Sequence, residues 1–178
     1  MATTGVRWLW AFVFLGAAAR LAAGEPAIRN LDVRGLRIGG TTAIVVDGDE
    51  LGTAPRLLLP FAAKQTLKSG ATKNRAVFEV TLDDAVQPGY HNLRVATEGG
   101  VSLPVVIGVE RLPQLPLAAK VDRLPVALHG SVTGSTVVST RFAGKAGQKV
   151  LVEVEAQRLG SRLRPIVHLY DSRRKQIA

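Results

Sequence analysis

Short segments of alternating apolar and polar residues, separated by glycine and proline, most constrain the fold of this chain. Residues 76–82 alternate in this way, and residues 149–156 alternate valines with Glu153 and Glu155. A period of two residues is typical of a half-buried β-strand. The 18 glycines and 9 prolines also favour many short strands over long helices. The sequence therefore predicts an all-β fold.

Turn residues mark further predicted strands, at residues 43–46, 56–59, 91–96, 101–109 and 166–170. Asp47, Gly48 and Asp49 are predicted to close the first of these strands as a turn. Pro104, which has no backbone N–H donor, indicates an edge or a bulge in the strand that contains it. Short strands at this spacing favour small antiparallel sandwiches.

The first 24 residues, 1–24, are predicted to be a secretory signal peptide. Arg7 precedes an apolar run at 8–19, and small residues follow at 22–24. The apolar run has about a dozen residues, short of the roughly 18 to 20 that a membrane-spanning helix needs. We therefore expect cleavage after Gly24, a secreted or extracytoplasmic protein in the periplasm or at the cell surface, and no transmembrane span afterwards.

Charge is distributed unevenly between the two halves of the chain. The net charge is +9 overall; residues 25–110 contain 9 basic and 10 acidic residues, whereas residues 111–178 contain 12 basic and 4 acidic residues. This asymmetry indicates two units with different surfaces. The absence of cysteine excludes a disulfide framework and a thiolate metal site.

Residues 25–110 carry an ordered set of turn and apolar positions. These are Pro26, Ala27, Ile28, Leu31, the run at 39–41, the run at 45–51, the turn at 87–89, Leu93, Val95, Gly99 and Gly100. Their order resembles an immunoglobulin-like domain of the IPT/TIG kind. The family often has an asparagine where this chain has Glu50. The resemblance implies a small immunoglobulin-like β-sandwich, followed by a proline-containing linker at 111–123.

A second set of positions spans residues 124–178. It consists of the run at 124–126, Gly130, the run at 141–143, the run at 146–148, Val152, Val154, Ala156, the run at 159–161, Leu163, Pro165, the run at 169–171, Ile177 and Ala178. This set is similar to the N-terminal part of the bacterial pre-peptidase C-terminal (PPC) domain, a secreted β-sandwich appended to extracellular hydrolases and envelope proteins. The family usually has an acidic residue shortly before Phe142, and here residues 138–140 are uncharged, so its calcium site is not carried over.

The family also continues with further strands after the position of Ala178. We therefore expect two small antiparallel β-sandwich modules after the signal peptide, with the second incomplete. The second module is expected to be a fragment, loosely packed until the missing C-terminal strands or domains of a longer chain are restored.

Candidate catalytic and metal-binding residues are scattered. His91, His129 and His168 have no metal-ligand spacing, and no glycine-flanked serine elbow or Ser-x-x-Lys pattern occurs. Three carboxylates at 47–50 have the wrong spacing for an EF-hand, and turn chemistry explains them. The sequence predicts no catalytic residue, no cofactor and no metal site, and hence no enzyme.

The densest basic patch is the candidate anionic-ligand surface. It comprises Arg158, Arg162, Arg164, Arg173, Arg174 and Lys175. Such a patch attracts phosphates, sulfated or carboxylated polysaccharides and anionic envelope surfaces; the alternative is a solvated loop face. Few aromatic residues are present to stack on bases, so nucleic acid is not a predicted partner.

Together these features predict a non-catalytic secreted binding or spacer region of a larger bacterial envelope or extracellular protein. Two alternatives stay open. In the first alternative, the chain comprises accessory domains of a secreted, peptidase-like hydrolase whose catalytic domain lies outside it. In the second, it is a stand-alone carbohydrate or cell-surface adhesion module.

Overall fold

The structure is a computed structural model that describes residues 24–68 and 70–178. Apart from Gly24, the predicted signal peptide lies outside the described residues. The described part contains strands β1 to β13 and a single short 3-10 helix, η1, so the predicted all-β fold is confirmed. Within these residues, no helix has the length and apolar character needed to cross a membrane.

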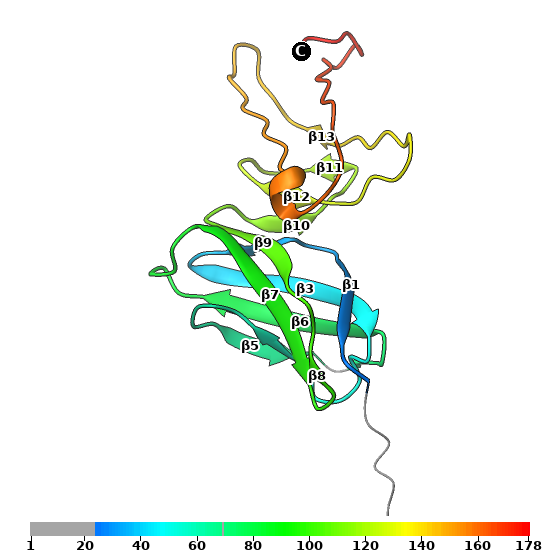
Figure 1. Cartoon of the computed structure of the whole chain (residues 1–178). Coiled ribbons are helices and arrows are strands. Elements are labelled where there is room, and N and C mark those ends of the chain that lie inside the picture. The colour runs from blue at the N-terminus through cyan, green and yellow to red at the C-terminus, as the bar shows by residue number, and fades with distance from the viewer. Residues whose placement is uncertain (1–23, 69) are drawn as a thin grey trace, which may run out of the picture.

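The first sheet is antiparallel and has the strand order β1-β3-β6-β5 (Figure 1). Its strands are β1 (Ala27–Leu31), β3 (Gly40–Asp49), β5 (Lys64–Leu67) and β6 (Arg75–Leu82). The alternation predicted for residues 76–82 holds in β6, where every second side chain is buried. Ile44 of β3 pairs with Phe78 of β6, and both are fully buried.

The second sheet has the order β2-β9-β7-β4, with β8 paired to β7. Its strands are β2 (Gly35–Arg37), β4 (Arg56–Leu58), β7 (Gly89–Thr97), β8 (Gly100–Val101) and β9 (Val105–Glu110). β2 runs parallel to β9, whereas the other pairs are antiparallel. The sequence had predicted antiparallel strands only.

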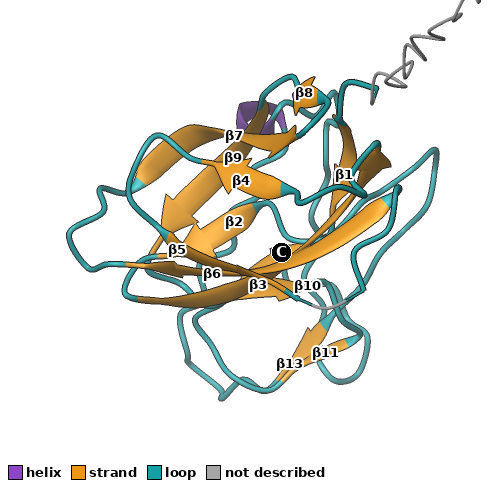
Figure 2. Cartoon of the chain, turned by 90° about the horizontal axis from the view of Figure 1, so that it is seen from below, coloured by secondary structure: helices purple, strands orange, loops and turns teal. Residues whose placement is uncertain are grey.

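One apolar core lies between these two sheets, which Figure 2 shows as separate layers. Phe78 and Ile44 enter it from the first sheet, and Leu36, Leu93 and Ile107 enter it from the second; all five are fully buried. Complete burial of side chains of this size stabilises a fold by about 1.5–3 kcal/mol each. The core therefore joins the two sheets into a single unit.

Two predicted strand boundaries in this unit are wrong. The strand predicted at 43–46 runs from Gly40 to Asp49, because β1 pairs with its second half and keeps residues 47–49 extended. The strand predicted at 101–109 is interrupted at residues 102–104, between β8 and β9, and Pro104 is the last residue of this gap. Ser102 bridges the gap: the Val95 N–H donates to Ser102 Oγ at 2.9 Å.

Residues 111–178 form two separate parallel strand pairs and long irregular segments. β10 (Gln114–Pro116) pairs with β12 (Ala127–His129), and β11 (Lys120–Val121) pairs with β13 (Arg141–Phe142). The predicted linker at 111–123 thus contains β10 and β11. Gln114 and Val121 are the buried residues of this region.

The strands predicted at 149–156 and 166–170 are wrong. Residues 149–155 are irregular, and residues 166–170 contain only an isolated bridge from Tyr170 to Gln176. Leu151 is 91% exposed and Ile166 is 82% exposed. An alternating segment becomes a strand only when a neighbour pairs with its backbone. Within the described residues no segment pairs with residues 149–155, and residues 166–170 pair with the C-terminal residues only through Leu169 and Tyr170.

The reversal predicted at residues 159–161 is present. Helix η1 (Gln157–Leu159) ends at Gly160, whose φ of 81° lies in the left-handed region that glycine adopts without steric cost. The Ser161 N–H then donates to the Ala156 carbonyl at 3.0 Å. This turn reverses the chain between the two irregular segments.

Candidate binding surface

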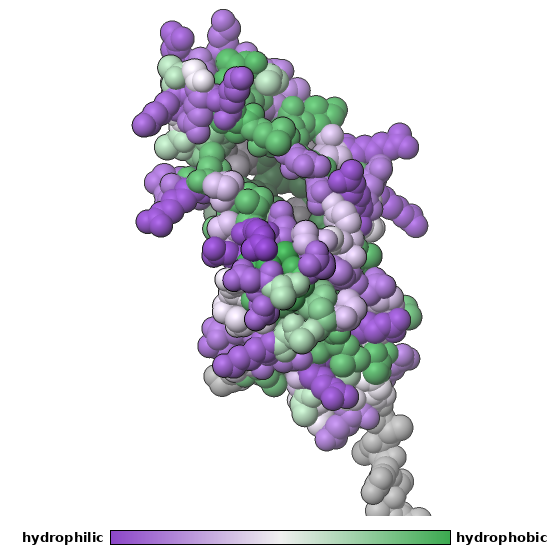
Figure 3. Space-filling model, turned by 90° about the vertical axis from the view of Figure 1, so that its left-hand side faces the viewer, coloured by the Kyte–Doolittle hydropathy of each residue, from purple (hydrophilic) through white to green (hydrophobic). Residues whose placement is uncertain are grey.

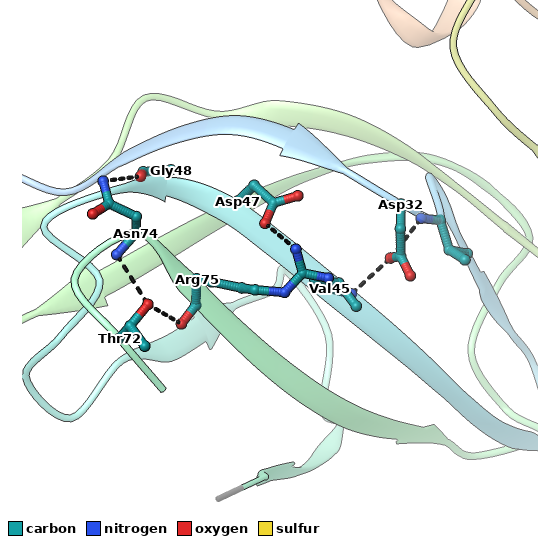
Figure 4. Close-up of polar contacts among 8 residues, drawn as sticks. Asp32, Val45, Asp47, Gly48, Thr72, Asn74 and Arg75 are labelled. Atoms are coloured by element: carbon teal, nitrogen blue, oxygen red, sulfur yellow. Dashed lines mark hydrogen bonds and ion pairs between the residues drawn. The ribbon is translucent and has the colours of Figure 1, made fainter. Parts of the chain in front are cut away.

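The carboxylates at 47–50 serve as ion-pair partners in the structure. Each of the three is paired with a different basic side chain: Asp47 with Arg75 at 2.9 Å, Asp49 with Arg29 at 2.7 Å, and Glu50 with Lys73 at 2.7 Å. Figure 4 shows the Asp47–Arg75 pair, together with the Asn74 side chain, which donates to the Gly48 carbonyl at 3.1 Å. These contacts tie β3 to β1 and β6. Among residues 24–68 and 70–178, no three or more His, Cys, Asp or Glu side chains gather as a metal site would require.

The three histidines lie in separate environments. His91 packs edge-on against Phe61, with ring centroids 5.0 Å apart, and His168 lies 6.3 Å from the ring of Tyr170. His129 pairs with Gln114. Each imidazole therefore has its own structural neighbour, and the fold brings no two of them together.

The contact between Gln114 and His129 joins β10 and β12 to the first unit. The Gln114 side-chain amide donates to the Leu112 carbonyl at 2.7 Å and to Glu110 at 3.2 Å, which leaves its Oε1 as the acceptor for His129 Nε2 at 2.7 Å. His129 Nε2 therefore carries the proton of this hydrogen bond. Burial lowers the pKa of His129, and the charge of Asp32 opposes that shift.

Gly35 of β2 lies directly against this contact. A Cβ atom at position 35 would lie 2.1 Å from Gln114 Oε1 and 3.1 Å from His129 Cε1. The first separation is too short for any real contact, and the second is tight. A side chain at position 35 would therefore displace the Gln114 side-chain amide from its contact with His129.

A second junction connects η1 with the first unit. The Tyr90 hydroxyl of β7 donates to the Glu155 carboxylate, and Arg158 lies 3.2 Å from the same carboxylate. The hydrogen bond to Glu155 is the main cause that raises the pKa of Tyr90. Arg34 donates to the Leu159 carbonyl at 2.9 Å, so η1 is held from two sides.

The six residues of the candidate anionic-ligand surface have different roles in the structure. Arg158 forms ion pairs with Glu153 and Glu155, and Arg173 lies 3.7 Å from Asp171. The other four are exposed and form no ion pair within the described residues: Arg162, Arg164, Arg174 and Lys175. η1 lies next to β9, whereas Figure 1 shows the C-terminal turn at the far end of this part of the chain.

A groove of about 460 Å³ lies between residues 153–158 and residues 163–165. Leu163 and Pro165 give it an apolar side, and Arg158 and Arg164 are the two members of the candidate surface that line it. Glu153 and Glu155 line it as well and balance these two positive charges. The groove itself is therefore mixed in charge, and the net positive charge lies around it.

Large apolar side chains are exposed mainly in residues 111–178. Apolar patches interrupt the polar surface of this part in Figure 3. The exposed set is Leu115, Leu124, Val137, Val138, Leu151, Val152, Val154, Ile166, Val167, Tyr170 and Ile177. Monomeric proteins rarely leave contiguous apolar surface uncovered without a binding role. Six of these positions lie in the segments 149–156 and 166–170 that sequence reasoning predicted as strands of a loosely packed module: Leu151, Val152, Val154, Ile166, Val167 and Tyr170.

No protein-family model matches this chain, and no curated protein is recognised as its relative.

Proposed function

We propose that this chain is a non-catalytic secreted binding or spacer region of a larger bacterial envelope or extracellular protein. The observation that carries the proposal is the contrast between its two parts. Residues 24–110 enclose a fully buried core between two sheets, whereas residues 111–178 expose about half of their large apolar side chains and bury only Val121 among them. The first part acts as the scaffold, and the second part presents the binding surface.

The environments of the polar residues support a binding role. The histidines and the carboxylates at 47–50, which are the usual carriers of acid–base or metal chemistry, contact structural partners. The two junctions, through Gln114 and through Tyr90, fix the base of the second part on the scaffold. Residues 111–178 are therefore attached to the scaffold through these contacts and expose apolar side chains elsewhere, which is the arrangement expected of an interaction module.

Co-sedimentation with purified bacterial cell walls tests this proposal. The chain from residue 25 to 178 should sediment with the walls, whereas cytochrome c, a small basic protein, serves as the control for charge alone. The same preparation should not hydrolyse peptide, ester or glycoside substrates. Absence of sedimentation, or turnover that disappears on replacing His91, His129 or His168, would overturn the proposal.

Anionic polysaccharide is the ligand class that one observation favours. Arg162, Arg164 and Arg174 are exposed and free of ion pairs within the described residues, in a part of the chain with 12 basic and 4 acidic residues. Binding to polygalacturonate should weaken steeply with salt, because the screening length falls from about 10 Å at 0.1 M to about 3 Å at 1 M.

The matched variants differ only in where the charge is changed. R162E/R164E/R174E should abolish retention on a polygalacturonate column at low salt. R37E/R56E/K64E changes the net charge equally on exposed residues of the first part and should leave most of the retention. Equal retention of the two triple variants would show that net charge, and not this surface, explains binding.

A further inference from the structure

Two unpaired segments flank η1: one runs into the helix, and the other runs away from it. The first arm is residues 149–155, which run into η1, and the second arm is residues 164–168, which leave it toward the C-terminus (Figure 1). The turn at Gly160 and the hydrogen bond from Ser161 to Ala156 fix this reversal. The arms are therefore fixed where they join η1, although their own backbones do not pair.

The backbone groups of both arms are free within the described part of the chain. No hydrogen bond is formed there by the N–H or carbonyl groups of residues 149–155 or 164–168. Such rows of unpaired groups are the template on which an additional β-strand forms its hydrogen bonds. The arms therefore offer a main-chain docking site.

The side chains of the arms favour an extended partner with alternating apolar residues. Val152 and Val154 are about half exposed, and Ile166 is 82% exposed, so each arm presents apolar surface next to its free backbone. Alternate residues of a strand point to the same face, so a partner with every second residue apolar would cover these side chains. The groove of about 460 Å³ lies where the arms meet η1.

The charges around the arms favour acidic residues at the remaining positions of the partner. Lys149 begins the first arm and Arg164 begins the second, with Arg162 just before it, and none of the three forms an ion pair within the described residues. The two carboxylates of the first arm, Glu153 and Glu155, both pair with Arg158, so the net charge around the arms is positive. Complementary charge selects the partner and speeds its encounter. A second copy of this chain is disfavoured, because it would bring together two parts that each have 12 basic and 4 acidic residues.

We propose that the two arms bind an extended segment of another polypeptide, with alternating apolar and acidic residues, which adds a β-strand to this part of the chain. This inference rests on the proposed binding function and adds a polypeptide partner at the arms to the anionic polysaccharide proposed for the basic surface. The strand would supply the backbone partners that the arms lack and would cover Val152, Val154 and Ile166.

A capped eight-residue peptide of alternating valine and glutamate is the probe. It should bind the chain from residue 25 to 178 and slow amide exchange in residues 149–155 and 164–168, with little change in β6. Two altered peptides separate the contribution of backbone hydrogen bonds to binding from the contribution of charge. Methylation of alternate backbone nitrogens removes hydrogen-bond donors, and lysine in place of glutamate reverses the charge; each should weaken binding at least tenfold.

Matched variants of the protein locate the site. V152K/V154K should weaken peptide binding at least tenfold, whereas V137K/V138K adds the same charge at exposed valines outside the arms and should leave it within about twofold. The methylated peptide uses the unaltered protein, so the test does not depend on how these variants fold.

Three results would overturn the inference: equal binding of the methylated peptide, peptide binding without protection of the arms, or no binding. Protection of the arms that rises with protein concentration alone would assign the site to a second copy and would also overturn it. If the peptide fails to bind while the chain still sediments with cell walls, the binding function stands and only this partner class is wrong.

Discussion

Replacing Gly35 with alanine should loosen the junction between the scaffold and residues 111–178. The new Cβ would lie 2.1 Å from Gln114 Oε1, so the Gln114 side chain must move and lose its hydrogen bonds to His129 and to the Leu112 carbonyl. Because Gln114 is buried, each unmade hydrogen bond costs about 1–3 kcal/mol. The lower chain entropy of unfolded alanine offsets about 0.5–1 kcal/mol. The expected net loss of unfolding free energy for the two hydrogen bonds is about 1–5 kcal/mol.

Urea unfolding of four proteins measures this effect as a double-mutant cycle. Both tryptophans, Trp8 and Trp10, lie within the predicted signal peptide, so far-UV circular dichroism is the appropriate signal for residues 25–178. With Gln114 already changed to alanine, Gly35→Ala should cost at least about 1 kcal/mol less, because the side chain that it displaces is gone.

Amide exchange gives a local readout of the same change. The Ala127 N–H donates to the Pro113 carbonyl at 2.9 Å beside Gln114, and Gly35→Ala should accelerate its exchange. Additive free energies, within about 0.5 kcal/mol, together with unchanged exchange at Ala127, would refute the contact between Gly35 and Gln114 as the reason for the glycine.

Three further predictions concern the core, pH and the N-terminus. Phe78→Ala should lower the unfolding free energy by about 3–5 kcal/mol, since Phe78 is fully buried, whereas Val154→Ala should change it by less than about 0.5 kcal/mol; similar losses in urea unfolding would show the second part to be packed as well. Burial lowers the pKa of His129, so the unfolded chain binds the proton first as pH falls below about 6.5, and stability should decline there by at most about 1.4 kcal/mol per pH unit. His129→Gln should flatten this decline, and an unchanged pH profile would contradict it. Finally, intact mass spectrometry of the chain exported from a bacterial host should show Glu25 as its first residue, and retention of residues 1–24 would refute the signal-peptide prediction.

The candidate surface shows where local sequence reasoning stops. A run of basic residues is visible in the sequence, so all six members of the anionic-ligand surface were identifiable in advance. The sequence did not show which of them form ion pairs. Arg158 is neutralised by Glu155, whose position depends on the contact with Tyr90, 65 residues earlier. Gln114 and Gly35 carried no sequence signal, because their contact exists only once β2 and β10 are brought together.

By itself, the sequence determined the all-β class and the alternation of β6. Period-two burial is a local property of a segment, and Phe78 is buried whenever residues 76–82 lie over an apolar layer. The same period at 149–156 did not produce a strand. Strand formation requires hydrogen bonds to a neighbour that is distant in sequence, and only the tertiary structure decides whether that neighbour is present. The fold supplies β3 and β5 on either side of β6, and within the described residues it leaves the arms beside η1 unpaired.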